Sequence, residues 1–315
     1  MFSSKETHLL AMILRSDMKC LKNVCEEYLE KIYDKSRIFA TEDFVYATGD
    51  IPILLVAHLD TVLSEAPRIL SSKDNKIWMG KNGLGADDRA GVFAVLKLIK
   101  KNSKNPSILF TTGEEVGGIG AMSFTKQFPE PPVPTKYIIE IDRRGRGQSV
   151  YYDCGNTEFE KYINSFGFKT NRGIFSDISF ICPNWNVAGV NLSAGYYNEH
   201  TEVESLKLDD LEYTIDRVKE LISDIDNAQY FNFEEKHDTR VKYIRCDICG
   251  CLVYENFITS LGEKKIKCCF NCLDQMIDWC EVCGEPYIPS KEEEEPKLCE
   301  VCACTKTSEN NLKKS

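Results

Sequence analysis

Short apolar runs, each followed by polar residues, recur along the first two thirds of the chain. A continuous apolar run of five or six residues predicts a strand that is buried on both faces, as in a parallel sheet. Apolar residues at helical spacing predict helices between these strands, and the N-terminal 45 residues look helical at first and then irregular. We expect strands at 52–57, 107–112, 137–141 and 187–192, and helices at 90–99, 121–127 and 206–226.

Polar residues stand at or just after the ends of most of these strands. His58 follows the first, Glu114 and Glu115 follow the second across one glycine, and Asp142 follows the third. Alternating strands and helices predict an α/β fold, and open α/β sheets bind ligands at the carboxyl ends of their strands. We therefore expect these side chains to meet at one edge of the sheet.

Charge and hydropathy argue against a nucleic-acid-binding protein and against a membrane protein. The formal net charge of −10 disfavours general affinity for nucleic acids or anionic membranes. No apolar run is long enough to span a bilayer, and the N-terminal sequence lacks the layout of a signal peptide. We expect a cytoplasmic protein that makes no membrane contact.

The cysteines are unevenly distributed. Eleven of the 15 lie between positions 246 and 304, which predicts a cysteine-rich module attached to an ordinary intracellular domain. The expected organisation is a main domain over 1–226, a connector over 227–243, the cysteine-rich module over 244–305 and a polar tail over 306–315.

Five segments between His58 and His200 have the residue types of a binuclear metal site. They are His58-Leu59-Asp60, Asp87-Asp88, Glu114-Glu115, Asp142 and Asn198-Glu199-His200. Imidazole nitrogens and carboxylate oxygens suit zinc, and a catalytic zinc site keeps one position open for water. Asp87 is the expected bridging ligand, because the glycines just before it allow a tight turn that directs its side chain inward.

The other four ligands divide between the two ions. We expect His58 and Asp142 to complete the shell of one ion, and Glu115 and His200 to complete the shell of the other. Two catalytic zinc ions are expected, and manganese or cobalt suits the same donors.

Two further carboxylates are expected to act beside the metals. Asp60 would orient His58 through its second ring nitrogen. Glu114 would bind no metal; it would accept a proton from the attacking water and pass it to the leaving amine. Each segment taken alone has a simpler explanation, such as a helix N-cap for Asp87-Asp88. The metal interpretation rests on their joint occurrence, with two of the chain's four histidines in the required places.

In their order and spacing, these segments resemble the co-catalytic di-zinc exopeptidases, a family of aminopeptidases, tripeptidases and carboxypeptidases. The resemblance covers about residues 50–225 and implies a three-layer α/β/α sandwich with a central mixed, mostly parallel sheet. Only 29 positions separate His58 from Asp87 and 58 separate Asp142 from His200, so the chain looks like the compact, lid-less type. The matching sequences are AHLDTV (57–62), GLGADDRAG (83–91), TTGEEVGGIGA (111–121), IEIDRRG (139–145) and NEHTEVE (198–204).

The resemblance implies a di-zinc metallopeptidase that acts on peptides, and an aminopeptidase is the first expectation. A carboxypeptidase, or an amidase or deacylase acting on a non-peptide amide, stays open. The alternative from another class is a protein-binding scaffold that recruits its partner through zinc fingers and carries an idle hydrolase fold.

Four residues near these segments are candidates for binding the substrate. Arg143 or Arg144 would grip a substrate carboxylate with paired hydrogen bonds, although salt bridges to surface acids explain both residues as well. Asp177 precedes an apolar run and either lines the pocket or caps a helix. Tyr197, next to Tyr196, either stabilises an oxyanion or packs against its neighbours.

The cysteine-rich module contains four CxxC pairs, which are a strong signal for structural zinc. The pairs are Cys246/Cys249, Cys269/Cys272, Cys280/Cys283 and Cys299/Cys302. Two structural zinc ions are expected, with the pairs combining in chain order or interleaved. Cys268 is an alternative to Cys269, and a redox role for one pair is a further alternative.

The charge of this module bears on its partner. Residues 242–306 contain 8 Lys and Arg against 12 Asp and Glu, a balance that disfavours nucleic acid. We expect the module to contact a protein partner or to dock onto the catalytic domain.

Overall fold

The computed structural model describes residues 2–74, 76–235, 243–248, 250–255, 258–261, 266–269, 272, 278–279 and 286–287. The chain divides into two units, Met1–Tyr243 and Ile244–Ser315. Some predictions lie outside the described residues, namely those on Cys249, Cys280, Cys283, Cys299, Cys302 and the tail 306–315.

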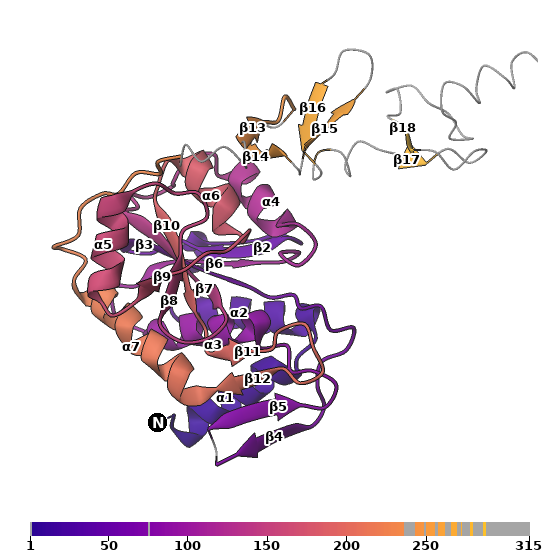
Figure 1. Ribbon diagram of the computed structural model, residues 1–315, viewed down its shortest axis with the longest axis vertical. Helices are drawn as coiled ribbons and strands as arrows, with labels where there is room; N and C mark the ends of the chain where they lie inside the picture. The colour runs from indigo at the N-terminus through magenta and orange to yellow at the C-terminus, as the bar shows by residue number, and fades with distance from the viewer. Residues whose placement is uncertain are drawn as a thin grey trace, which may run out of the picture. The chain divides into compact units, whose positions relative to one another are not determined.

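An eight-stranded mixed sheet forms the centre of the first unit (Figure 1). Its four middle strands run parallel to one another, and antiparallel strands border them on both sides. The carboxyl ends of the parallel strands therefore meet at one edge. The strand order is β1 (Ile38–Ala40), β2 (Phe44–Ala47), β6 (Pro106–Thr111), β3 (Ile51–His58), β7 (Tyr137–Arg143), β10 (Gly189–Ser193), β8 (Gln148–Val150) and β9 (Lys169–Thr170).

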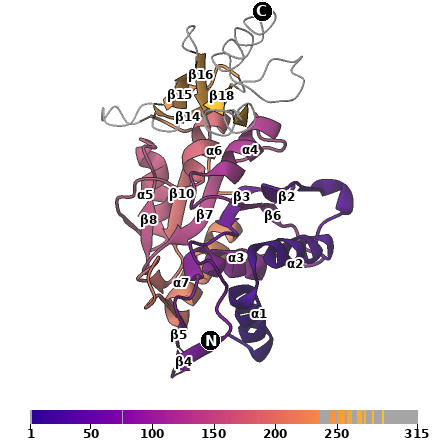
Figure 2. The same cartoon turned by 90° about the vertical axis from the view of Figure 1, so that its right-hand side faces the viewer.

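Helices cover both faces of the sheet, as Figures 1 and 2 show. One face carries α1 (Ser4–Arg15), α2 (Met18–Glu30), α3 (Ala86–Leu98) and α7 (Leu208–Ser223). The other face carries α4 (Ile119–Gln127) and α6 (Ile178–Trp185). The helix α5 (Thr157–Ser165) packs beside β9. A short 3-10 helix, η1 (Lys35–Arg37), precedes β1. This arrangement confirms the predicted α/β/α sandwich with a mostly parallel mixed sheet.

A second, four-stranded sheet was not predicted. It consists of β11 (Tyr196–Tyr197), β12 (Ser205–Lys207), β5 (Ile77–Gly80) and β4 (Leu70–Lys73), in that order. Its strands are short and partly exposed, so they lack the continuous apolar run that marks β3 or β7. In this sheet Trp78 of β5 lies opposite Leu206 of β12, which joins two distant parts of the chain.

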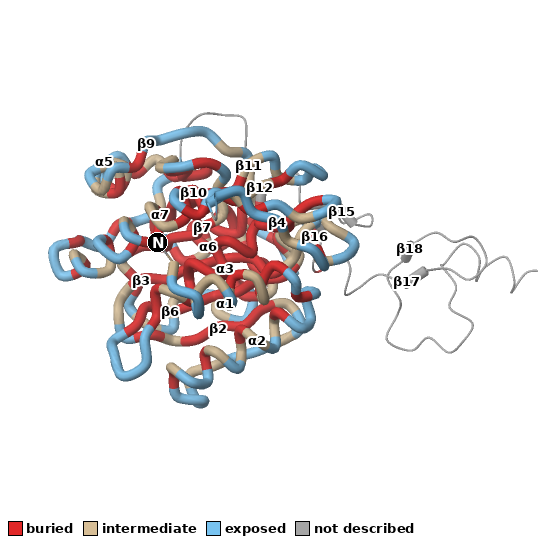
Figure 3. Tube along the Cα trace, turned by 90° about the horizontal axis from the view of Figure 1, so that it is seen from below, coloured by how far each residue is buried: buried red, intermediate tan, exposed pale blue. Residues whose placement is uncertain are grey.

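The helix α3 runs through the interior of the unit (Figure 3). Twelve of its 13 residues are buried, because β3 and β7 lie on one side of it and α1 and α7 on others. Gly91 permits the close approach of α3 to β7. A Cβ atom at this position would overlap the carbonyl oxygen of Ile141 and would lie 2.5 Å from both carboxylate oxygens of Asp88.

Residues 227–235, within the expected connector, pack against the first unit. The N–H group of Ala188 donates to the carbonyl of Phe231 at 2.9 Å, and the N–H group of Phe231 donates to Lys136 at 3.0 Å. The Phe231 ring is buried and lies 5.0 Å from the ring of Phe159. The first unit therefore continues as ordered structure at least to Glu235.

Short strand pairs lie in the described part of the chain from Tyr243 onward. They are β13 (Tyr243–Arg245) with β14 (Leu252–Tyr254), β15 (Ile258–Leu261) with β16 (Ile266–Cys269), and β17 (Asp278–Trp279) with β18 (Pro286–Tyr287). Across the described ranges of both units, no helix combines the length and apolar character needed to cross a membrane.

The packing of α3 on β7 gives a test of the fold. We expect Gly91→Ala to lower the free energy of unfolding by about 1 to 3 kcal/mol, because the added methyl group overpacks this contact. Urea denaturation would measure the change, with Lys19→Ala on the exposed face of α2 as a control that should stay within about 0.5 kcal/mol of wild type. Equal midpoints for both variants would contradict the tight contact.

Candidate metal centre

The five predicted ligands of the binuclear site lie together at the carboxyl edge of the parallel strands. The Nε2 atom of His58 lies 3.3 Å from Oδ1 of Asp87 and 3.5 Å from Oδ1 of Asp142. The Nε2 atom of His200 lies 3.3 Å from Oδ2 of Asp87 and 3.1 Å from Oε1 of Glu115. Each carboxylate oxygen of Asp87 therefore faces a different histidine, as a bridging ligand must.

These separations suit donors that share metal ions. Zinc binds nitrogen and oxygen at about 2.0 to 2.1 Å, so two donors on one tetrahedral ion lie about 3.3 Å apart. The carboxylate oxygens near the buried Nε2 atom of His58 are close, but within the described part of the chain none of them forms a hydrogen bond with it. A buried polar atom without a partner calls for an explanation, and a bound cation provides one.

The backbone before Asp87 has the turn that the sequence predicted. Gly85 has a φ of 66°, in the left-handed region that glycine adopts without strain. The turn places Asp87 at the beginning of α3, opposite the end of β7.

Asp60 connects the first histidine to the two glutamates. Its Oδ1 atom lies 3.4 Å from Nδ1 of His58. The same carboxylate accepts hydrogen bonds from the backbone N–H groups of Glu114 at 3.3 Å and Glu115 at 3.2 Å. The Nδ1 atom of His58 also lies 3.2 Å from the backbone carbonyl oxygen of Asp60, so Asp60 contacts the imidazole at the ring nitrogen that does not face Asp87.

Glu114 lies beside the ligands. Its Oε2 atom is 3.9 Å from Nε2 of His58, farther than any of the ligand contacts above. Burial raises the pKa of Glu114 well above its usual value. A buried carboxyl group at the border of a metal site is suited to exchange a proton with water.

The electrostatics of the cluster indicate a need for positive charge. Burial raises the pKa of Glu115 to about 7, and the charge of Asp87 adds to that shift. A hydrogen bond to Asp87 raises the pKa of His200 to about 9. Burial opposes a charged imidazole at His58, yet the neighbouring carboxylates, Asp142 first among them, raise its pKa well above the usual value. Each of these shifts has the same physical cause, namely negative carboxylates gathered in a buried place, and bound cations would neutralise that charge.

A buried hydrogen-bond network that was not predicted holds Asp142. The hydroxyl of Ser176 lies 3.1 Å from Oδ2 of Asp142 and 2.6 Å from Oε2 of Glu140. The side-chain amide of Asn191 donates to the carbonyl of Asp142 at 3.1 Å. The hydroxyl of Tyr196 lies 3.1 Å from Oδ1 of Asp142. A polar Asn191 inside the apolar strand β10 was the signal available in the sequence.

Glu204 is a second residue that sequence reasoning missed. Its side chain is buried and accepts hydrogen bonds from three backbone N–H groups, two in the turn before α3 and one in the first turn of that helix. The donors are Leu84 at 3.1 Å, Gly85 at 2.6 Å and Asp87 at 3.0 Å. Glu204 therefore fixes the backbone that presents the bridging carboxylate, from a position four residues after His200.

The two arginine candidates for substrate binding make contacts within the protein. Arg144 forms an ion pair of 2.8 Å with Glu199, which is the surface salt bridge considered as the simpler explanation. Arg143 donates through Nη2 to the carbonyl of Arg172 at 3.2 Å.

The other two candidates also have partners in the protein. The hydroxyl of Tyr197 donates to Asp210 at 2.7 Å, whereas the neighbouring Tyr196 is the tyrosine that reaches Asp142. Asp177 is fully buried and accepts a hydrogen bond from the hydroxyl of Thr111. Burial raises the pKa of Asp177 to about 7.

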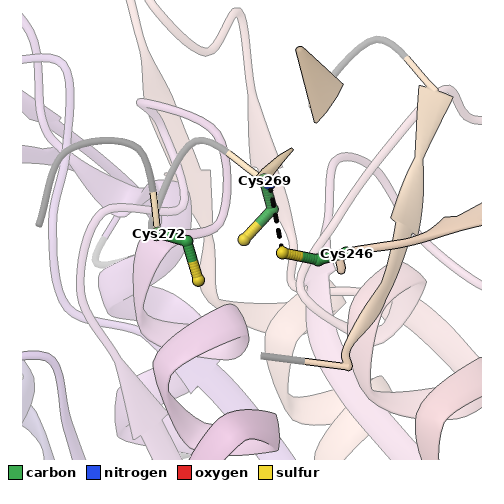
Figure 4. Close-up of side chains that lie close together, drawn as sticks. All are labelled: Cys246, Cys269 and Cys272. Atoms are coloured by element: carbon green, nitrogen blue, oxygen red, sulfur yellow. Dashed lines mark hydrogen bonds between the residues drawn. The ribbon is translucent and has the colours of Figure 1, made fainter. Parts of the chain in front are cut away.

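A cysteine cluster lies in the second unit (Figure 4). The sulfur atoms of Cys246, Cys269 and Cys272 all lie within 4.8 Å of one another. The N–H group of Cys269 donates to the sulfur of Cys246 at 3.4 Å, whereas Sγ of Cys268 points to the carbonyl of Cys269 at 3.4 Å. The cluster thus combines the first and second CxxC pairs, and it includes Cys269 in place of Cys268.

Comparison with known proteins supports the resemblance for part of the chain. Residues 45–180 match Peptidase family M28, a range that contains four of the five predicted catalytic ligands. A segment of 125 residues is 31% identical to a probable carboxypeptidase from Emericella nidulans. This match covers 37% of the present chain and 29% of that relative.

Solved structures show the same fold. The aminopeptidase PepT from Bacillus cereus superposes with a TM-score of 0.55 and 15% identity, over 70% of this chain and 98% of its own. A tripeptidase from Staphylococcus aureus gives a TM-score of 0.56 and 16% identity, over 70% and 99% of the two chains. The TET aminopeptidase from a marine sediment Thaumarchaeota archaeon gives 0.57 and 16%, over 71% and 99%. The chain thus combines a segment similar to Peptidase family M28 with a fold that these two aminopeptidases and the tripeptidase share.

Proposed function

We propose that this protein is a two-metal peptidase whose site is built from five side chains of the first unit. The observation that carries the proposal is the placement of Asp87, whose two carboxylate oxygens each lie 3.3 Å from a different histidine. The similarity of residues 45–180 to Peptidase family M28 supports peptide-bond hydrolysis as the reaction.

The metal assignment follows the contacts. His58 and Asp142 would hold one zinc ion, Glu115 and His200 the other, and Asp87 would hold both. Zinc in such a site supplies a Lewis acid for the scissile carbonyl and lowers the pKa of water, and manganese or cobalt suits the same donors.

The protein's own residues perform the proton transfers. Glu114 accepts a proton from the attacking water and delivers it to the leaving amine. Burial supports this role, because it raises the pKa of this carboxyl group above its usual value and so favours uptake of the proton. Asp60 keeps His58 in orientation and, through the backbone of Glu114, also holds the base beside the ligands.

We propose an aminopeptidase specificity. Two of the solved structures that share the fold are named aminopeptidases, and another is named a tripeptidase. A carboxypeptidase is the second candidate, because the curated relative that matches part of the chain is named a probable carboxypeptidase.

We also propose that the cysteine-rich module binds two structural zinc ions. The three clustered sulfur atoms support a first site formed by Cys246, Cys269 and Cys272 together with Cys249. The remaining two CxxC pairs would form the second site. Such sites supply folding energy to a small module, which would then contact a protein partner.

Removal of the proposed base is the first test of the activity. We expect Glu114→Gln to keep both catalytic metals but to lower turnover at least about 100-fold, as loss of a general base does. Mass spectrometry of a peptide pool with free and acetylated N-termini would measure this. Stepwise loss of N-terminal residues from free peptides supports an aminopeptidase, and C-terminal trimming supports the carboxypeptidase. A wild-type rate in the variant would rule out Glu114 as the base.

The role of Glu204 in holding the turn before α3 predicts an effect on metal binding. Glu204→Gln places an amide N–H₂ group where one carboxylate oxygen accepted hydrogen bonds, so the turn should loosen. We expect the affinity for catalytic zinc to fall about 10- to 100-fold, as with other residues that support ligands. Competition with a chelator would measure the affinity. The exposed neighbour in Glu202→Gln is the matched control, and equal affinities in the two variants would refute the role of Glu204.

Two adjacent cysteines allow a matched test of the first structural site. We expect Cys269→Ser to lower the zinc content by one ion per chain, because only Cys269 of the two shares the cluster with Cys246 and Cys272. Cys268→Ser should keep the full zinc content. Elemental analysis after gel filtration would measure both variants, and the reverse result would assign the ligand to Cys268.

A further inference from the structure

Asp177 is a buried carboxylate that the proposed mechanism does not use. Its side chain is fully buried, and it stands at the N-cap position of α6 without making the capping hydrogen bond that this position allows. It accepts a hydrogen bond from the hydroxyl of Thr111 instead. The Oδ1 atom of Asp177 has no hydrogen-bond partner among the described residues. A buried carboxylate with an unpaired oxygen is unfavourable, so its position calls for an explanation.

Thr111 stands beside the first metal ligand. It ends β6 and is the register partner of His58 on the neighbouring parallel strand β3. Register partners on adjacent strands project from the same face of a sheet, so the two side chains lie side by side. The carbonyl of Thr111 also accepts the N–H group of Leu59 at 2.8 Å, which joins the end of β6 to the backbone just after His58. A contact that fixes Thr111 therefore acts on the strand end that carries His58.

The residue before Asp177 holds the strand on the other side of His58. The hydroxyl of the buried Ser176 lies 3.1 Å from Oδ2 of Asp142 and 2.6 Å from Oε2 of Glu140, both in β7. In the sheet, β3 lies between β6 and β7. Neighbouring strands are about 4.8 Å apart, so β6 and β7 are separated by about 9.6 Å. Two consecutive residues thus contact the two strands that flank the end of β3.

The charges of the metal centre act on Asp177. Burial raises its pKa, the negative charges of Asp60 and Asp142 add to this rise, and a positive charge on His58 opposes it. Cations at the proposed metal positions would be the largest local charges and would offset the carboxylate. A cation close by therefore explains how the fold accommodates a buried carboxylate with an unpaired oxygen.

We propose that Asp177 is a positioning residue of the metal centre. It holds Thr111 at the end of β6, and its neighbour Ser176 holds Asp142 in β7. Together the two contacts keep the strand ends at the spacing that places the Nε2 atom of His58 3.5 Å from Oδ1 of Asp142. This role differs from the contact with substrate that the sequence suggested for Asp177. The proposal rests on the proposed peptidase function and its two-metal site.

Substitutions of threonine test the proposal through metal binding. We expect Thr111→Val, which removes the hydroxyl but keeps the shape of the side chain, to lower the affinity of the catalytic site for cobalt about 10- to 100-fold, as with other residues that support ligands. Thr111→Ser keeps the hydroxyl and should bind cobalt as the wild type does. Thr125→Val is the matched control, because the buried hydroxyl of Thr125 donates to the carbonyl of Ala121 within α4 at 3.1 Å. This control should keep the wild-type affinity.

Titration of the full chain with cobalt, after dialysis against a chelator, would measure the affinity. Cobalt on nitrogen and oxygen ligands differs in visible absorption from cobalt on the thiolates of the second unit, so the catalytic ions are seen separately. An unchanged affinity in Thr111→Val overturns the proposal. An equal loss in Thr125→Val overturns it as well, because the effect then reflects a general loss of stability.

A double variant covers the case in which Thr111→Val is unfolded by circular dichroism. Thr111→Val combined with Asp177→Leu replaces both partners of the hydrogen bond with apolar groups of similar shape, so this protein should fold. It should still bind cobalt more weakly than the wild type, and a wild-type affinity would overturn the proposal.

The metal readout separates this role from the peptidase function. If the wild type binds two catalytic cobalt ions but hydrolyses no peptide, the proposed peptidase function fails. The cobalt affinities of the variants then still decide whether Asp177 positions the ligands.

Discussion

The contact of one carboxylate with two imidazoles is the constraint on which the rest of the first unit depends. Asp87 can face His58 and His200 at once only if the turn before α3 is held in place and α3 approaches the sheet closely. Glu204 satisfies the first condition with three hydrogen bonds to that turn. Gly91 satisfies the second, because a larger residue would push α3 away from β7. Residues without any contact to substrate thus determine whether the site exists.

The site divides into a rigid part and a part held less firmly. His58 is buried and the side chain of Asp142 is 8% exposed, and the two residues lie at the ends of adjacent parallel strands. Asp60 contacts His58, and the network around Ser176 holds Asp142. His200 lies between the short strands β11 and β12, is 49% exposed at its side chain and has a left-handed φ of 62°. Such a backbone conformation costs a non-glycine residue roughly 1 to 2 kcal/mol, so its neighbours must stabilise it. The two proposed metal positions therefore differ in how firmly the protein holds their ligands.

Much of the fold and the proposed ligands could be predicted, because both depend on local sequence. Continuous apolar runs mark β3, β6, β7 and β10, and the polar residues that end these runs must gather at one edge. Contacts between distant segments have no such local sequence pattern. The sequence around Glu204 does not indicate that its side chain accepts hydrogen bonds from a backbone turn more than a hundred residues earlier. Tyr196 and Tyr197 illustrate a second limit. Successive side chains of a strand point to opposite faces, so only one of the two can reach Asp142, and the sequence could not tell which without the pairing of β11.

The division of the ligands between two sheets has a consequence for the order of events during synthesis. Four proposed ligands lie in the strands of the large sheet or in segments that adjoin it, and all four precede residue 143. His200 depends on the small sheet, which pairs β5 with β12 across more than a hundred residues. Once β3, β6 and β7 have emerged from the ribosome, the nascent chain can bring four of the five donors together. The fifth donor, His200, reaches its position only after β12 has emerged as far as Lys207. Completion of the small sheet would then be the step that prevents the proposed metal centre from forming before the chain has folded up to Lys207.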